Sequence, residues 1–188
     1  MAKVTKRGDE LQSKKLELLE DITSTVSEIY KIKGPIKDVR TVIDVLGGKV
    51  IENSQTDNMD ILVCQNGVQI VIPGYTAREQ KNMHLAKGIG YIYLYSNYMA
   101  NNKKYDVNEA MKMHNIYIFA LSFMMPRHEY LQVLLAETKG NVADTKKIAE
   151  YFHVPEMSAI MRGVYLGYLE LFWERECKKY GYTNKENK

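Results

Sequence analysis

Cysteine is scarce in this sequence: it occurs twice in 188 residues, and neither occurrence belongs to a CxxC pair or another metal-binding spacing. This scarcity argues against a disulfide framework and a zinc knuckle, and it predicts two free thiols. Long apolar runs are lacking too. None approaches the ~20 residues that cross a bilayer, and the opening residues contain no apolar segment of a signal peptide. We therefore expect a cytoplasmic protein without a membrane partner.

A strong excess of charge of one sign is also missing. The net charge is only +3, and the hydrophobic (45%) and charged (26%) fractions are those of a globular protein. With 188 residues, against ~100 to 200 per domain, the chain is expected to form one domain or one domain with a small appendage. The basic excess lies at the two ends of the chain, which predicts solvated tails and ranks a nucleic-acid partner below a protein partner.

The motifs of common enzyme classes are absent as well. None of the histidines belongs to an HExxH motif; they are His84, His114, His128 and His153. No serine lies in a GxSxG elbow, and residues 88–91 lie inside an expected helix, where they form no phosphate-binding loop. A zinc site that recruits His84 and His114 would have two ligands, whereas zinc usually takes three or four.

Apolar periodicity predicts a mainly helical chain with one small sheet, which is an α+β fold. We expect strands over 49–52, 60–64 and 68–72, and helices over 11–32, 35–46, 76–97, 106–125, 127–138, 141–152 and 156–180. Asn66 and Gly67 form the dipeptide of a tight hairpin, which predicts an antiparallel sheet. Pro35 is expected at the first position of its helix, and residues 76–79 have the pattern of a capping box.

Two helical segments stand out. Residues 116–121 are apolar nearly all round, which predicts burial of that helix. Gly88 and Gly90 each cost about 1 kcal/mol relative to alanine in a helix, so each glycine requires a reason. For Gly88, one reason would be the close approach of a neighbouring backbone or of a bound peptide.

Four local strings follow the expected hairpin in a fixed order, at 83–91, 115–126, 148–155 and 162–167. Together they resemble the ImmA/IrrE family of zinc metallopeptidases, which act on prophage, mobile-element and stress-response repressors. The family's active-site helix has the pattern xxLAHExGHxxxH, and its next helix has the pattern EANxFAAxLLMP. The residues kept in these two helices are Leu85, Ala86, Gly90, Phe119, Ala120, Met125 and Pro126. The resemblance implies a zincin-like helical domain with a small three-stranded antiparallel sheet, followed by a C-terminal helical part.

The sequence departs from the family where catalysis would be carried out. The resemblance implies a zinc ion held by two histidines and an acidic residue, with a glutamate that activates water. At the matching positions stand Lys87, Gly88, Tyr91 and Asn115, none of which suits either task. We therefore expect no zinc, no cofactor and no peptidase activity. With His84, these residues form an expected degenerate cleft, which is a candidate partner-binding site.

Two placements of Lys87 are open at this point. In the first, its ammonium fills the space of the metal and is hydrogen-bonded by Asn115 and the Tyr91 hydroxyl, because a buried lysine requires such partners. In the second, Lys87 points to solvent at the mouth of the cleft.

The resemblance and its departures predict a catalytically inactive ImmA/IrrE-like protein that binds a repressor or antirepressor in a phage, mobile-element or stress circuit. The partner would dock in the old cleft or on the helix over 11–32. The expected divisions are an N-terminal amphipathic helix, a degenerate metallopeptidase-like core, a C-terminal helical subdomain and a flexible basic tail, at 1–34, 35–126, 127–180 and 181–188.

Two other functions, and a dimeric instead of a monomeric state, stay open. One function is a zinc metallopeptidase with a rearranged site that recruits His84 and His114. The other is a DNA-binding regulator that uses the basic termini and a helix-turn-helix-like segment at 148–162; this segment offers Glu156 and Met157 where basic or amide groups would meet bases, which favours packing instead. A homodimer is also open. The last expected helix has more apolar residues than one contact with the core requires, and the others could form a dimer interface. These residues are Tyr165, Leu166, Tyr168, Leu169, Phe172 and Trp173.

Overall fold

The computed structural model describes residues 2–3, 10–57, 59–64, 67–96 and 109–170. The expected α+β class is confirmed. The elements are, in chain order, β1 (Ala2–Lys3), α1 (Glu10–Ile29), α2 (Arg40–Val45), β2 (Lys49–Asn53), β3 (Asp60–Cys64), β4 (Gly67–Pro73), α3 (Arg78–Tyr91), the π-helix η1 (Ile92–Ser96), α5 (Glu109–Met124), α6 (Arg127–Ala136), β5 (Thr138–Lys139), β6 (Val142–Ala143), α7 (Thr145–Phe152) and α8 (Glu156–Tyr165). The expected tail at 181–188 lies outside the described residues.

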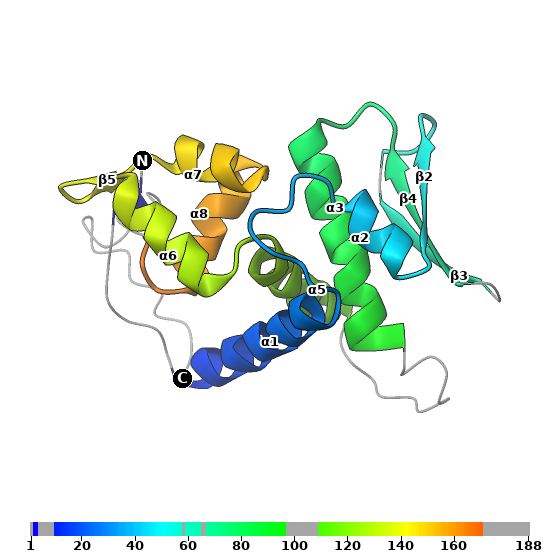
Figure 1. The fold of residues 1–188 in the computed structure, drawn as a ribbon, viewed down its shortest axis with the longest axis horizontal. Helices are drawn as coiled ribbons and strands as arrows, with labels where there is room; N and C mark the ends of the chain where they lie inside the picture. Colours follow the sequence, from blue (N-terminus) through cyan, green and yellow to red (C-terminus); the bar gives the residue numbers. More distant parts are fainter. Residues whose placement is uncertain (1, 4–9, 58, 65–66, 97–108, 171–188) are drawn as a thin grey trace, which may run out of the picture.

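Helix α3 lies between two parts of the fold (Figure 1). The sheet that contains β4 packs on one side of α3, and α5 packs on the other. Helices α6, α7 and α8 extend the helical part away from this sheet, and α1 packs across α5. The helix that carries most of the candidate site residues is therefore held by neighbours from both halves of the molecule.

The larger sheet has the order β2-β4-β3 and is mixed. Strands β3 and β4 pair in antiparallel fashion, with Leu62 opposite Gln69, so the hairpin prediction is confirmed. Strand β2 runs parallel to β4, with Val50 opposite Ile70, so the expectation of a wholly antiparallel sheet is wrong. The Asn66-Gly67 dipeptide bears on the pairing of β3 with β4 and carries no information about the pairing of β2 with β4. The apolar strand β4 takes the central position, where the side chains of Ile70 and Ile72 are fully buried.

A second sheet, with the order β1-β6-β5, was not expected from the sequence. Its strands are two residues long, so they carry too little alternation for a periodicity argument. The β5–β6 pair occupies part of the segment expected to begin a helix at 141. Helix α7 instead begins at Thr145, because the side chain of Asp144 caps it by accepting a hydrogen bond from the Lys147 amide at 3.3 Å.

Replacing Asp144 with alanine is expected to lower the free energy of unfolding by about 1 kcal/mol, because the cap of α7 is lost. Asparagine keeps the accepting oxygen, so Asp144→Asn is expected to retain most of the stability. Urea denaturation of both variants measures the difference. Equal losses in the two variants would show that the cap does not stabilise the start of α7.

Other helix boundaries also differ from the prediction. Helix α2 begins at Arg40 and not at Pro35, since the Asp38 carboxylate accepts a hydrogen bond from the Arg40 amide at 3.0 Å. Helix α3 has Ala77 as its N-cap with no side-chain cap bond, so the expected capping box does not form. Helix α8 ends at Tyr165, where Gly167 adopts a φ of 74° and the Tyr168 amide bonds the Gly163 carbonyl at 2.8 Å. The expected continuation to 180 is wrong as far as residue 170, and the rest lies outside the described residues.

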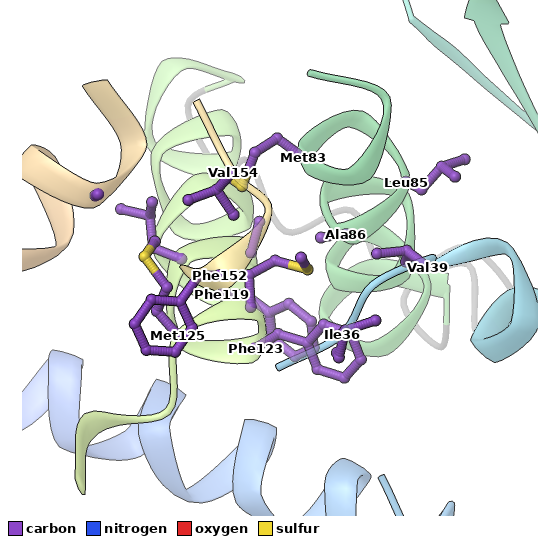
Figure 2. Packing of buried hydrophobic residues seen from close by; sticks show 14 of the residues in the cluster. Ile36, Val39, Met83, Leu85, Ala86, Phe119, Phe123, Met125, Phe152 and Val154 are labelled. Carbon is purple, nitrogen blue, oxygen red and sulfur yellow. The ribbon is translucent and has the colours of Figure 1, made fainter. Parts of the chain in front are cut away.

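The core is centred on the contact between α3 and α5 (Figure 2). Ala86 of α3 lies toward α5, and the Phe119 and Phe123 rings of α5 stack with their centroids 5.9 Å apart. The predicted burial of 116–121 is confirmed: Tyr117 is half-buried and the other five residues are buried. Residues of the irregular segment before α2 and of the α7–α8 turn complete the same cluster, among them Ile36, Val39 and Val154.

Close packing accounts for both glycines of α3. A Cβ atom on Gly88 would lie 2.3 Å from Cδ1 of Ile70 on β4, and one on Gly90 would lie 2.8 Å from Cδ1 of Phe119 on α5. The sequence argument that each glycine requires a reason is thus confirmed. The reason for Gly88 is the side chain of Ile70, and the expected approach of a backbone is wrong.

A buried arginine joins three helices. The side chain of Arg162 on α8 is fully buried, and it forms an ion pair with Glu20 of α1. It also donates hydrogen bonds to the Met125 carbonyl at 2.9 Å and to the Ser122 hydroxyl of α5 at 3.0 Å. Ser122 in turn donates to Glu20 at 3.2 Å. This network fixes α1 against α5 and α8.

Candidate functional site

Three of the five predicted site residues share one face of α3. His84, Lys87 and Tyr91 follow one another at steps of one helical turn, and all three are half-buried. Gln80 precedes them by one turn on the same side. We call Gln80, His84, Lys87 and Tyr91 the α3 polar face. Gly88 is not part of it, because Gly88 is buried against Ile70 of β4.

Lys87 lies over an aromatic ring of α5. Its Nζ atom is 5.1 Å from the centroid of Tyr117, which is a cation–π contact. Burial lowers the pKa of the Lys87 ammonium. Burial also raises the pKa of the Tyr117 phenol, against the opposing effect of its hydrogen bond with Ser158 of α8. Among the described residues, Lys87 forms no hydrogen bond or ion pair, so the expected bonds to Asn115 and the Tyr91 hydroxyl are absent.

Asn115 lies on α5 and faces η1, which follows the end of α3. Its Nδ2 atom donates a hydrogen bond to the Tyr95 hydroxyl of η1 at 3.0 Å, and the Tyr95 and Tyr91 rings lie 6.2 Å apart. Its Oδ1 atom is buried and accepts no hydrogen bond. Of the two placements of Lys87 left open by the sequence, the one in which Asn115 binds its ammonium is therefore not found among the described residues. The reason is that Tyr95 is two helical turns beyond Lys87.

His84 has one bonded and one unbonded ring nitrogen. Its Nε2 atom lies 3.3 Å from the amide nitrogen of Gln80, whereas its Nδ1 atom is buried and has no hydrogen-bond partner. Burial, with a further contribution from the charge of Lys87, lowers the pKa of His84. The lowered pKa favours the neutral form of the imidazole.

His114 has a different environment. His114 is exposed on α5. Its ring and the Tyr165 ring form a T-shaped pair with their centroids 5.7 Å apart, and its Nδ1 atom lies 3.4 Å from the Tyr165 hydroxyl. Within the ranges that the structure describes, no three His, Cys, Asp or Glu side chains gather into a metal-binding group. The described residues thus offer no third ligand to a pair of His84 and His114.

The helix-turn-helix-like segment corresponds to α7, its turn and the start of α8. Its arginine, Arg162, is fully buried in the network with Glu20, and Ser158 is buried as well. Glu156 accepts a hydrogen bond from Thr145 at 2.6 Å, which ties the two helices together. In the apolar cluster proposed for a dimer, the side chains described pack on the protein's own core: Tyr165, Leu166, Tyr168 and Leu169. Phe172 and Trp173 lie outside the described residues.

Two residues that sequence reasoning missed contribute to the site. Tyr117 was assigned to the core with the rest of 116–121, and Gln80 was not singled out. Both carried a signal: Gln80 lies one turn before His84, and Tyr117 is the residue in 116–121 with a polar tip. A buried aromatic ring with a hydroxyl usually has a polar partner, which in this protein is Ser158.

Two surface cavities lie near the start of α3 and the segment before α2. One, of about 200 Å³, is lined by Asp38, Arg40, Thr76, Arg78, Lys81, Asn82 and Leu85. Its cations already have partners: Lys81 lies 2.7 Å from Glu52, Arg40 pairs with the same carboxylate, and Arg78 donates to the Lys37 carbonyl at 2.9 Å. The other, of about 420 Å³, is lined by residues 30–33, 36–38, 41, 42 and 45. The cations that line the first cavity therefore already have hydrogen-bond or ion-pair partners within the protein.

No family model matches this sequence, and no curated protein matches it. Among solved structures, a Mycobacterium tuberculosis transcriptional regulator has a similar fold, with a TM-score of 0.55 and 11% sequence identity. The match covers 76% of this chain and 46% of the regulator, so the chain spans less than half of that protein's length. At this identity the likeness shows the fold alone. None of the helices described here combines the length and apolar character needed to cross a membrane.

Proposed function

We propose that this chain is a catalytically inactive ImmA/IrrE-like protein that binds a regulatory protein, such as a repressor or antirepressor, through the α3 polar face and does not cut it. The observation that carries the proposal is the state of Lys87. The lysine occupies the position of a zinc-binding histidine in the resembling family, and its ammonium lies over the Tyr117 ring. A cation at this place repels a divalent metal and supplies no lone pair to bind one.

The neighbouring positions support the same function. Gly88, where the family has its catalytic glutamate, is packed against Ile70 and has no side chain to accept a proton. Tyr91 and Asn115 replace the remaining ligands with neutral groups. The half-buried tyrosine at position 91 is of the kind that protein interfaces favour.

A regulatory role also fits the comparison with solved structures. The protein of similar fold is named a transcriptional regulator. That name belongs to a longer chain, so it supports a class of process and does not identify a partner.

Partner binding is tested in two stages. Tagged full-length protein captures partners from its native host after nuclease treatment, and a captured repressor-like or antirepressor-like protein is then purified and titrated calorimetrically. We expect a stoichiometric complex whose affinity falls about tenfold or more in Lys87→Glu, because a charge at the centre of the interface is reversed. Lys146 is exposed on α7, so Lys146→Glu makes the same charge change elsewhere and should leave the affinity unchanged.

The same complex tests the two competing functions. We expect the partner's intact mass to stay unchanged after incubation with the protein and added zinc. Cleavage that disappears in His84→Ala would establish a rearranged peptidase instead. Capture of nucleic acid in a control without nuclease, and of no protein in the treated sample, with an affinity that falls steeply as salt rises, would establish the DNA-binding regulator.

A further inference from the structure

Two groups of the α3 polar face, the Nδ1 atom of His84 and the ammonium of Lys87, have no hydrogen-bond acceptor within the part of the chain that the structure describes. The amide nitrogen of Gln80 can only donate, so the Nε2 atom of His84 must be the acceptor of their 3.3 Å contact. A neutral imidazole has one proton, which is therefore on Nδ1. This Nδ1–H group is buried and has no partner.

Lys87 adds a second unsatisfied donor one helical turn away. Its half-buried ammonium has three N–H groups, and the Tyr117 ring provides a cation–π contact but no accepting lone pair. His84 and Lys87 are three residues apart on α3, so their side chains are neighbours on one side of the helix and can approach the same ligand. Burial without acceptors is unfavourable for both groups.

We propose that the α3 polar face is a carboxylate-binding site, in which Lys87 Nζ donates to one oxygen of an aspartate or glutamate side chain of the protein partner, and the His84 ring turns outward so that its Nδ1 donates to the other oxygen. This inference rests on the proposed function and adds the chemistry by which the partner is recognised. A carboxylate carries one negative charge and several lone pairs, which matches one ammonium and one neutral N–H. A phosphate dianion would leave excess negative charge here, since Lys87 is the cation of this face.

The test uses a blocked tripeptide with a single glutamate, N-acetyl-Ala-Glu-Ala-amide, titrated into the full-length protein labelled with ¹⁵N. We expect the side-chain nitrogen signals of His84 and Lys87 to shift together, with His84 reporting an Nδ1–H tautomer. The glutamine version of the peptide is expected to bind about tenfold to a hundredfold more weakly, because the charge-assisted hydrogen bonds are lost.

Matched variants assign the effect to the two donors. Lys87→Met and His84→Phe are each expected to weaken binding of the glutamate peptide about tenfold, whereas Lys146→Met should leave it unchanged. Lys87→Arg keeps the charge and should recover part of the affinity. Circular dichroism confirms that each variant is folded before it is titrated.

Three results would overturn the inference. They are equal binding of the glutamate and glutamine peptides, no shift of His84 or Lys87 with either peptide, and tighter binding of inorganic phosphate than of the glutamate peptide. A purified partner that binds Lys87→Met as well as the wild type would reject the carboxylate site but leave the proposed function in place. If the glutamate peptide binds but no protein partner is found, the carboxylate site stands and the proposed function is rejected.

Discussion

Replacing Arg162 with methionine is expected to lower the free energy of unfolding by about 3–5 kcal/mol, the usual effect of breaking a buried ion pair from one side. For a chain of this length, that corresponds to a fall in the melting temperature of roughly 6–20 °C. The physical reason is that Glu20, itself largely buried, keeps its charge and loses its counter-ion. Urea denaturation and thermal unfolding followed by circular dichroism measure both quantities.

The size of the effect follows from how many groups Arg162 satisfies. Its guanidinium serves the Glu20 carboxylate, the Ser122 hydroxyl and the Met125 carbonyl, and these groups belong to or adjoin two different helices, α1 and α5. Methionine fills most of the volume but donates no hydrogen bond, so buried acceptors are left unsatisfied. Loss of this contact is expected to loosen α1 in particular, because α1 is attached here through Glu20.

Two further variants test whether the unpaired charge, and not the change of side-chain volume, causes the loss of stability. Arg127 is exposed at the start of α6, so Arg127→Met should change stability by less than about 0.5 kcal/mol. The double variant Glu20→Met with Arg162→Met removes both charges and is expected to recover part of the loss, since no unpaired charge stays buried. An Arg162→Met protein as stable as Arg127→Met would show that the ion pair does not hold α1 in place.

Sequence reasoning succeeded where one local pattern determines the structure. The all-round apolar character of 116–121 correctly predicted a buried helix, and Asn66 with Gly67 correctly predicted the β3–β4 hairpin. It failed where a single side chain redirects the backbone. The Asp38 carboxylate accepts a hydrogen bond from the Arg40 amide just before α2, and Asp144 caps α7. Both helices begin several residues after the expected positions, and hydrophobic periodicity carries no information about such side-chain hydrogen bonds.

In the candidate site, too, the sequence predicted the local helical arrangement but not the contacts that depend on tertiary packing. The helical repeat predicts that His84, Lys87, Gly88 and Tyr91 lie on nearly one face of α3, and this is correct for all of them except Gly88. It could not predict that Gly88, one residue and about 100° away from Lys87, faces β4, because that depends on where the sheet packs. Nor could it pair Lys87 with Tyr117, since the axial offset between α3 and α5 is a tertiary property.

Replacing Gly88 with alanine is expected to destabilise the protein by about 1–2 kcal/mol. Alanine is favoured over glycine in a helix by about 1 kcal/mol, so an unobstructed site would gain stability. Here, however, the new Cβ atom would lie 2.3 Å from Cδ1 of Ile70, and overpacking of a core typically costs about 1–3 kcal/mol. We expect the clash to prevail, because Ile70 is fully buried in the central strand and has little room to move. Urea denaturation measures the change.

A double-mutant cycle with Ile70→Val separates packing from a role of Gly88 in partner binding. Valine lacks Cδ1, so Gly88→Ala should be at least about 1 kcal/mol less harmful in the Ile70→Val protein than in the wild type. Gly90→Ala is the matched control: its Cβ would meet Phe119 at 2.8 Å and not Ile70, so its cost should be the same in both backgrounds. If Gly88→Ala left stability unchanged but weakened partner binding, Gly88 would belong to the binding surface after all. Coupling to Ile70 with unchanged partner binding would instead establish that glycine at this position serves the packing of α3 on β4.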